Sequence, residues 1–332
     1  MRLDSRMGLV SVFFGGLMII SIISLIVGFA VLIKGADLFV DGASGVAGNF
    51  KLSKMLIGLT IVAFGTSAPE FAVSVKSLLS QSGDMVLGNV IGSNILNILL
   101  ILGVSSMFHS LSVKNNTVRK ELPILLMLTI AFAVLISDHF FSLDMSNSFS
   151  RGDGIILILF FGVFLYYLIS MTRKKVDDDS EVTYPSLKKS FFLTSIGLLG
   201  IVFGSNFVVD GASEFAKVIG ISERMISLTI VALGTSLPEL VTSVMATRKG
   251  EFDIAIGNVV GSNIFNIGMV IGVPTMLFGG ITNISFSNID LLVMILSAFL
   301  LFLFAFNDHK ISRKEGALFL VLFVIYYLYV VI

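Results

Sequence analysis

One segment of the chain occurs twice, and this duplication constrains the fold more than any other feature of the sequence. Residues 58–104 and 227–273 align without a gap at an offset of 169, and 24 of the 47 positions are identical. The identities fall mainly on Gly, Thr, Ser, Pro, Glu and Asn, which unrelated apolar segments would not share. The matching motifs are LTIVAFG (59–65) with LTIVALG (228–234), TSAPE (66–70) with TSLPE (235–239), GNVIGSNILNI (88–98) with GNVVGSNIFNI (257–267), and VDGAS at 40–44 and 209–213.

The chain is apolar enough to be a polytopic membrane protein. Of its 332 residues 55% are hydrophobic and only 13% are charged, whereas soluble domains carry about 25% charged residues. A helix that spans a bilayer needs about 20 mostly apolar residues. Windows of that length predict ten spans, at 10–33, 55–79, 85–107, 121–137, 154–171, 191–213, 225–247, 254–278, 288–306 and 314–331.

The expected fold class is therefore an all-α polytopic membrane protein with ten transmembrane helices. Each copy of the repeat holds five spans, an odd number, so the second copy enters the membrane from the opposite face. Many secondary transporters are such inverted repeats, with a binding site near the midplane where the repeats meet. We expect residues 1–171 to form the first five-helix repeat, 172–189 a cytoplasmic linker, and 190–332 the second repeat.

The distribution of charge predicts the orientation and excludes several functions. A net charge of zero with no basic block argues against a nucleic-acid partner, and no Cys with only three His leaves no zinc cluster. Of the 22 Lys and Arg residues, six fall on the side that holds the termini and 16 on the side of the central loop. Cytoplasmic loops carry the excess of basic residues. We expect a cell (plasma or inner) membrane protein with both termini outside and the central loop in the cytoplasm.

The second span of each repeat contains a sequence that breaks a helix. The segments 65–70 (GTSAPE) and 234–239 (GTSLPE) each place a proline inside an apolar run, where it removes one N–H and displaces the carbonyl four residues earlier. Helices 2 and 7 should therefore be discontinuous, with the unwound backbone lining a cavity or buried in protein. Glu70 and Glu239 lie near the middle of these spans, and no Lys or Arg lies at that depth. The missing counter-charge points to a bound cation or a proton.

The third span of each repeat adds a polar face. Asn89, Ser93 and Asn97 recur at intervals of four residues and so share one side of a helix, and Asn258, Ser262 and Asn266 repeat the pattern. Together with the two carboxylates these are hard oxygen donors, which suit Ca²⁺ and Na⁺ better than transition metals. A glycine stripe beside them, at Gly88 and Gly92 and again at Gly257 and Gly261, favours close approach of the broken helix.

Simpler interpretations of these residues stay open. Ser67 and Glu70 also match a capping box at a helix start. The Asn residues, Asn89 and Asn258 above all, could serve as hydrogen-bonding links between helices. Residues 177–179, three aspartates in the central loop, are best explained as a solvated charged segment.

The paired GTSAPE and GTSLPE motifs, each followed by its GNV-GSN segment, resemble the repeats of the calcium/cation antiporter superfamily, and most of all its prokaryotic sodium/calcium exchangers. The resemblance implies a ten-helix antiporter fold with Ca²⁺ at the centre, Na⁺ sites around it, and no cofactor. At matching positions it implies the central ligands Glu70, Asn97, Glu239 and Asn266. It implies flanking Na⁺ sites formed by the side chains of Thr66, Ser67, Ser93, Thr235, Ser236 and Ser262 and the backbone carbonyls of Ala63 and Ala232.

The resemblance also suggests which ions are coupled. Some prokaryotic and potassium-dependent relatives have Asp where this chain has Asn266. Asn leaves two formal negative charges at the centre, which match one Ca²⁺ and argue against K⁺ dependence. Thr and Ser in both motifs favour Na⁺ over H⁺ as the coupled ion.

We therefore expect a transporter rather than an enzyme: an antiporter that exchanges Na⁺ for Ca²⁺ by alternating access and extrudes Ca²⁺. Its expected partners are the two ions and the lipid bilayer, with no nucleic acid or nucleotide, and we expect a monomer. The alternatives are a Ca²⁺/H⁺ antiporter that uses the same glutamates and, from another class, an uncoupled cation channel. An ATP-driven pump is disfavoured because the sequence has no G-x-x-x-x-G-K-[ST] motif and no room for a soluble domain.

Overall fold

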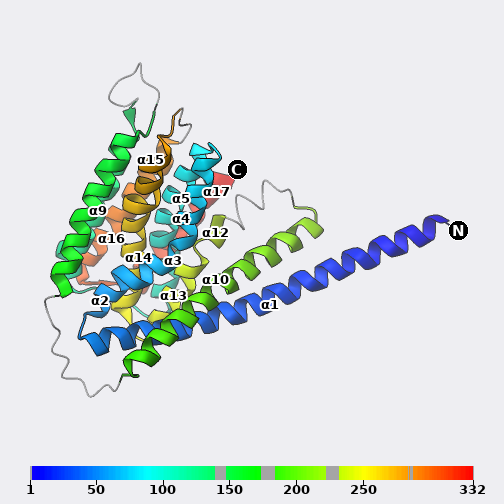
Figure 1. Ribbon diagram of the computed structural model, residues 1–332, viewed down its shortest axis with the longest axis horizontal. Coiled ribbons are helices and arrows are strands. Elements are labelled where there is room, and N and C mark those ends of the chain that lie inside the picture. The colour runs from blue at the N-terminus through cyan, green and yellow to red at the C-terminus, as the bar shows by residue number, and fades with distance from the viewer. Residues whose placement is uncertain are drawn as a thin grey trace.

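The computed structural model describes residues 2–138, 147–172, 184–221, 232–282, 284 and 287–331, with side chains from residue 18 onward except those of 232 and 331. Most of this chain is helical. Two long helices lie side by side and cross one flank of a bundle formed by the other helices, here called the central bundle (Figure 1). The N-terminal end of the first helix extends well beyond that bundle.

The two long helices, α1 (Arg2–Phe50) and α10 (Leu187–Val218), form an antiparallel pair. Their contact is a glycine seam, the set Gly28, Gly35, Gly42, Gly197, Gly204 and Gly211. The members of each helix are seven residues apart, and those of α10 are the copies of those of α1 at the offset of 169. An added Cβ at Gly204 would lie 2.5 Å from the backbone nitrogen of Leu32. The glycines in these two helices thus allow the backbones to touch, as small residues do in membrane interfaces.

Both long helices exceed the predicted spans 10–33 and 191–213. α1 continues through the VDGAS motif to Phe50 because no residue that ends a helix occurs before it, and the small residues of that motif pack toward the start of α10. It ends where Lys51 adopts a left-handed conformation with φ 52°. The N–H of Leu52 then bonds the carbonyl of Ala47 at 2.9 Å and closes the last turn.

The second predicted span is broken, as the sequence predicts. It runs through α2 (Lys54–Ile57), the π-helical turn η1 (Gly58–Val62) and α3 (Ala63–Thr66), and resumes after Ser67 as α4 (Ala68–Leu79). The two halves are bent by 45°. The seventh span shows the same break, with α12 (Ala232–Gly234) followed by α13 (Leu237–Arg248). The start of the predicted span 225–247 lies outside the described residues.

Two continuous helical rods fill the middle of the central bundle. The first comprises α5 (Gly83–Leu96), the π-helical turn η2 (Asn97–Leu102) and α6 (Gly103–Phe108). The second comprises α14 (Phe252–Phe265), η5 (Asn266–Ile271) and α15 (Gly272–Phe278), and every residue from Ile254 to Phe265 is buried. Both π-helical turns begin at the duplicated Asn residues. π-Helical turns inside α-helices often mark functional sites.

The glycine stripe packs as expected on the second rod. An added Cβ at Gly257 would lie 3.0 Å from the Cα of Gly58, and one at Gly261 would lie 3.0 Å from the Cα of Leu59. The backbone of η1 therefore lies directly on α14. A Cβ added at Gly92 would meet no neighbouring atom of the described residues within 4 Å, and the whole segment equivalent to η1, residues 227–231, lies outside them.

The remaining elements surround these rods. They are the π-helical turn η3 (Thr117–Glu121) with α7 (Leu122–Leu135), α9 (Arg151–Thr172), α16 (Asn288–Asp308) and α17 (Arg313–Val331). Two short antiparallel strands, β1 (Leu111–Ser112) and β2 (Lys310–Ile311), join the loops before α7 and before α17. The all-α expectation holds apart from this pair and one isolated bridge between Phe149 and Ile281.

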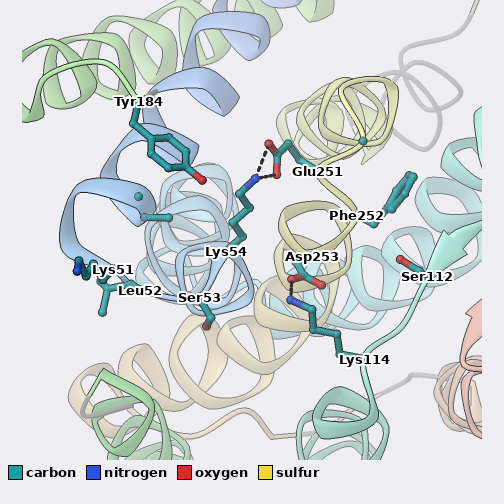
Figure 2. A pocket seen from close by; sticks show the side chains of 13 residues that line it. Lys51, Leu52, Ser53, Lys54, Ser112, Lys114, Tyr184, Glu251, Phe252 and Asp253 are labelled. Carbon is teal, nitrogen blue, oxygen red and sulfur yellow. Dashed lines mark hydrogen bonds and ion pairs between the residues drawn. The ribbon is translucent and has the colours of Figure 1, made fainter. Parts of the chain in front are cut away.

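Two ion pairs join the halves of the chain at the end of the bundle that holds the turn between α13 and α14 (Figure 2). Lys54 contacts the Glu251 carboxylate at 2.8 Å, and Lys114 contacts that of Asp253. All four side chains belong to loops or helix ends that the lysine count predicts to be cytoplasmic.

Ten spans were expected, and the described residues bear this out in part. Six helices are long and apolar enough to cross a membrane, and the bent pair of α2–α3 with α4 makes a seventh. Of the three other predicted spans, 121–137 is represented by α7, only 14 residues long, 225–247 lies partly outside the described residues, and 314–331 matches α17, whose first turn holds three charges. The chain is a multi-pass membrane protein.

The glycine seam predicts opposite effects for two glycine substitutions. Gly204→Ala should destabilise the protein by about 1–3 kcal/mol, because its Cβ has no room beside Leu32. At Gly162 on α9 an added Cβ would have no neighbouring atom of the described structure within 4 Å. Gly162→Ala should therefore be neutral or stabilise the helix by up to about 1 kcal/mol. Thermal unfolding of both variants in detergent measures the difference, and equal melting temperatures would contradict close packing at the seam.

Candidate functional site

The two helix breaks place the duplicated glutamates in the middle of the molecule. Glu70 lies in the first turn of α4 and Glu239 in the first turn of α13, each directly after a proline. Proline suits the first turn of a helix, since the N–H it lacks has no partner there. Both carboxylates are buried, 0% and 1% exposed. The positive end of each half-helix dipole stabilises the negative charge of its carboxylate but offsets only part of it.

Each glutamate is bound by a serine of the other repeat. The Ser67 hydroxyl donates to Glu239 Oε1 at 3.1 Å, and the Ser236 hydroxyl donates to Glu70 Oε1 at 3.4 Å. The capping-box interpretation of Ser67 is therefore wrong: Ser67 does precede α4, but its side chain makes no hydrogen bond to the backbone of that helix. The Ser67 hydroxyl instead donates its hydrogen bond to the Glu239 carboxylate of the opposite break.

Other hydroxyl groups surround the same carboxylates. Those of Thr66 and Ser262 face Glu239, and that of Thr235 faces Glu70. Thr66 also donates to Asn258 Oδ1 at 3.0 Å. Neutral hydroxyl groups thus surround the carboxylates of Glu70 and Glu239, which are close enough for their negative charges to repel each other.

Asn89 and Asn258 hold the breaks in shape. Asn89 donates to the carbonyl of Glu70 at 2.9 Å and to Ser74, and Asn258 donates to the carbonyl of Glu239 at 3.4 Å and to Ser243. These contacts tie each third-span helix to the start of the half-helix beside it. The interpretation of both residues as links between helices is confirmed.

A second set of asparagines crosses the repeat boundary. Asn97 donates to Asn263 Oδ1 at 2.8 Å, and Asn263 donates to the carbonyl of Asn94 at 3.2 Å. Sequence reasoning overlooked Asn94 and Asn263, although both are buried beside the site. Their identity across the duplication, 169 residues apart, was the signal that could have revealed them.

Four oxygens of the predicted central ligands have no partner. They are Glu70 Oε2, Asn97 Oδ1, Glu239 Oε2 and Asn266 Oδ1, all buried and without a hydrogen bond to any described residue. Buried polar atoms in native proteins nearly always have partners, and each exception calls for an explanation. The four form two pairs of repeat-equivalent oxygens, so the pattern belongs to the duplicated motif.

The predicted flanking residues differ in their surroundings. Thr66, Ser67 and Ser236 are buried beside the carboxylates, and the Ser262 hydroxyl is buried without a hydrogen bond to the described residues. Ser93 donates to the carbonyl of Asn89 within its own helix.

The two predicted carbonyl ligands lie just before the breaks. The carbonyl of Ala63 accepts the N–H of Ser67 at 3.0 Å, as in an ordinary helix, and Ala232 begins α12.

The donor set at this centre is oxygen only. No three His, Cys, Asp or Glu side chains gather at one point anywhere in the described residues. A cation here would be held by two carboxylates together with amide, hydroxyl and carbonyl oxygens, which is the ligand chemistry of Ca²⁺.

Known proteins resemble this chain over most of its length. The model of the sodium/calcium exchanger protein family matches residues 20–170 and 189–332. The sodium/calcium exchanger MaX1 of Methanosarcina acetivorans is 30% identical over 342 residues, covering 92% of this chain and 97% of its own. The inner membrane protein YrbG of Escherichia coli is 34% identical over 297 residues, covering 85% and 89%. The structure of the exchanger NCX_Mj soaked with Na⁺ and Sr²⁺ superposes with a TM-score of 0.81 at 34% identity, covering 93% of this chain and 97% of that one.

Two substitutions at the site should change the stability of the fold in opposite directions, one by removing a buried charge and the other by removing hydrogen bonds. In solution without Na⁺ or Ca²⁺, Glu239→Gln should stabilise the fold by at least about 1 kcal/mol, since a neutral amide replaces a buried charge that repels Glu70. Asn258→Ala should destabilise it by about 1–3 kcal/mol, because Thr66, Ser243 and the Glu239 carbonyl lose a partner. Melting temperatures measured in chelator test both. A lower value for Glu239→Gln would show that the carboxylate is compensated within the protein.

Proposed function

Because the chain belongs to the sodium/calcium exchanger family, whose members are transporters and not enzymes, we propose that it is a secondary active antiporter that exchanges Na⁺ for Ca²⁺ by alternating access. The observation that carries the proposal is the set of four buried oxygens without partners, on Glu70, Asn97, Glu239 and Asn266. In this proposal they are the central Ca²⁺ ligands. The two formal negative charges match one Ca²⁺.

The flanking hydroxyls support Na⁺ sites next to the Ca²⁺ site. Thr66, Ser67, Thr235, Ser236 and Ser262 surround the same two carboxylates. In the proposal they bind Na⁺ together with Ser93 and the backbone carbonyls of Ala63 and Ala232. Two carboxylates cannot neutralise one Ca²⁺ and a full set of Na⁺ at once, so the ions exclude each other and their fluxes are coupled. Na⁺ entering from outside would drive Ca²⁺ out of the cell.

The structure supports ten helices in two inverted repeats. The repeat-equivalent helices α1 and α10 run antiparallel, as inverted copies must, and both repeats break at the same motif. The family model matches two ranges separated by residues 171–188, which fits repeats of 1–171 and 190–332 with a linker at 172–189. With the lysine-rich loops in the cytoplasm, both termini lie outside.

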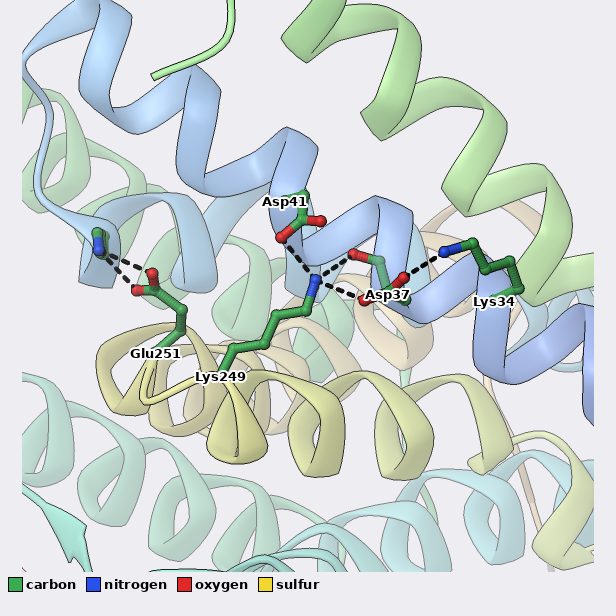
Figure 3. A network of polar contacts seen from close by, with 6 residues as sticks. Lys34, Asp37, Asp41, Lys249 and Glu251 are labelled. Carbon is green, nitrogen blue, oxygen red and sulfur yellow. Dashed lines mark hydrogen bonds and ion pairs between the residues drawn. The ribbon is translucent and has the colours of Figure 1, made fainter. Parts of the chain in front are cut away.

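Alternating access needs parts that move, and the α1–α10 pair is suited to that role. Close backbone contact along the glycine seam makes the pair one unit. Figure 3 shows its polar link to the central bundle: Lys249, at the end of α13, contacts Asp37 at 2.7 Å and Asp41 at 2.5 Å. Its ammonium also donates to the carbonyl of Asp37 at 2.8 Å. We call these contacts the Lys249 latch.

The repeat-equivalent positions cannot form a second latch. At the offset of 169, Ser80 replaces Lys249, Asn206 replaces Asp37, and only Asp41 has an acidic equivalent, Asp210. Ser80 and Asn206 cannot form an ion pair. The latch therefore stabilises closure at the predicted cytoplasmic end and biases the transporter toward conformations that open outside.

Ion flux tests the proposed function directly. In proteoliposomes loaded with Ca²⁺, an imposed Na⁺ gradient should drive Ca²⁺ movement, and Glu70→Gln or Glu239→Gln should reduce it at least about 100-fold by removing a charged ligand. Glu214→Gln, on the exposed face of α10 in a pair with Lys217, is the matched control and should transport normally.

The same vesicles separate the alternatives. Flux driven by a pH gradient but not by Na⁺ would indicate a Ca²⁺/H⁺ antiporter, and Ca²⁺ conductance without a coupled ion would indicate a channel. A requirement for K⁺ would contradict the interpretation of Asn266. Normal flux in both Gln variants would contradict the ligand assignment.

Hydrogen–deuterium exchange tests the latch. Lys249→Gln should increase deuterium uptake near the ends of α1 and α13, because that end opens more often when the ion pairs are lost. Lys34→Gln, which removes a pair with Asp37 within α1 alone, should leave uptake in α13 unchanged. Equal uptake in the two variants would show that the latch does not restrain the α1–α10 pair.

A further inference from the structure

A polar cavity of about 570 Å³ lies at the predicted cytoplasmic end, away from the central site. Its wall combines the end of α1, the loop to α2, the loop after β1, Tyr184 and the turn between α13 and α14 (Figure 2). Three lysines and two acids line it. Glu251 and Asp253 are paired with Lys54 and Lys114, whereas Lys51 is exposed and makes no ion pair within the described residues. The described lining therefore carries one more positive than negative charge.

An apolar crevice of about 470 Å³ adjoins this cavity. One side is formed by Val46 and Phe50 of α1 with Phe191 of α10, and the other by α2, η1 and the last turns of α9. Leu52 lines both spaces, so the charged cavity and the apolar crevice meet there. Phe50, Ile169 and Phe191 of the crevice are 49%, 58% and 47% exposed, so the crevice opens on the apolar outer surface of the helices. The cavity opens at the polar end of the bundle.

The cavity and crevice together match a phospholipid, which has a charged head group next to apolar acyl chains. Basic pockets between transmembrane helices on the cytoplasmic side are suited to anionic head groups, and an open crevice at membrane depth is suited to an acyl chain. The duplication does not impose the positive charge, because Gly220 and Glu223 occupy the positions equivalent to Lys51 and Lys54. The lysines are thus specific to one end of the molecule.

We propose that the cavity and crevice together bind one anionic phospholipid, with its phosphate beside Lys51 and Lys54 and one acyl chain in the crevice below Leu52. The bound lipid contacts α1 and α10 on one side and the central bundle on the other. Its site is separate from the glutamates, so binding is measurable whether or not the protein exchanges Na⁺ for Ca²⁺.

The test titrates the full-length protein in neutral detergent with dioleoyl phosphatidylglycerol, and with dioleoyl phosphatidylcholine in parallel, and measures bound lipid by native mass spectrometry. Phosphatidylglycerol should bind at least fivefold more tightly. Lys51→Gln should weaken it about tenfold and leave phosphatidylcholine unchanged. Lys310→Gln, an exposed lysine at the same end that lines neither space, is the matched control and should bind like the wild type.

A second pair of variants tests the crevice. Ile169→Trp narrows it from α9 and should weaken phosphatidylglycerol binding several-fold, whereas Val163→Trp, on the same helix outside the crevice, should not. Soluble glycerol 1-phosphate should fail to compete at concentrations that match the lipid. Equal affinity for the two lipids, unchanged binding by Lys51→Gln or Ile169→Trp, or full competition by glycerol 1-phosphate would overturn the proposal.

Discussion

Two buried carboxylates that repel each other, with no basic side chain beside them in the described structure, are the constraint on which the rest of the molecule depends. Removing such charges from water costs several kcal/mol each unless something compensates them. The protein compensates only part of this cost, with one serine from the opposite repeat for each glutamate and the positive ends of two half-helices. One oxygen of each carboxylate stays without a partner in the described structure, and in the proposed exchanger a cation supplies the missing charge.

Holding the carboxylates there requires two broken helices, and the packing around the breaks supplies the support. Asn89 and Asn258 each bind the carbonyl of the nearby glutamate, and the backbone of η1 lies against Gly257 and Gly261 of α14. The second rod is therefore buried along its whole middle section. The asparagine contacts occur once in each repeat. The contacts between η1 and α14 join the two repeats, so the site forms only when both halves of the chain are folded together.

The long helix pair differs in kind from this rigid centre. Glycines join α1 to α10, while the described ion pairs of that pair with the central bundle are limited to those of the Lys249 latch. Beyond the latch, the pair packs on the central bundle through a buried apolar cluster that includes Phe39 of α1 and Val62 of η1. Apolar contact is not directional, so a pair that is firmly joined within itself is able to slide over that surface as one body. In the proposed transport cycle, the Lys249 latch at one of the two duplicated ends would make that end the preferred closed one.

The sequence by itself determined the duplication, the membrane class, the helix breaks at 65–70 and 234–239, and the acids and amides of the centre, because proline and buried charge have strong local costs in an apolar segment. It missed Asn94 and Asn263 and left open a capping hydrogen bond that the Ser67 side chain does not make, since local spacing does not say which residues of the other repeat lie opposite. The tertiary structure decided those pairings. It also decided that the glycines of α1 and α10 form a seam, and that Lys249 meets Asp37 and Asp41, residues more than 200 positions away. Such contacts depend on how two inverted halves pack, which no stretch of sequence encodes alone.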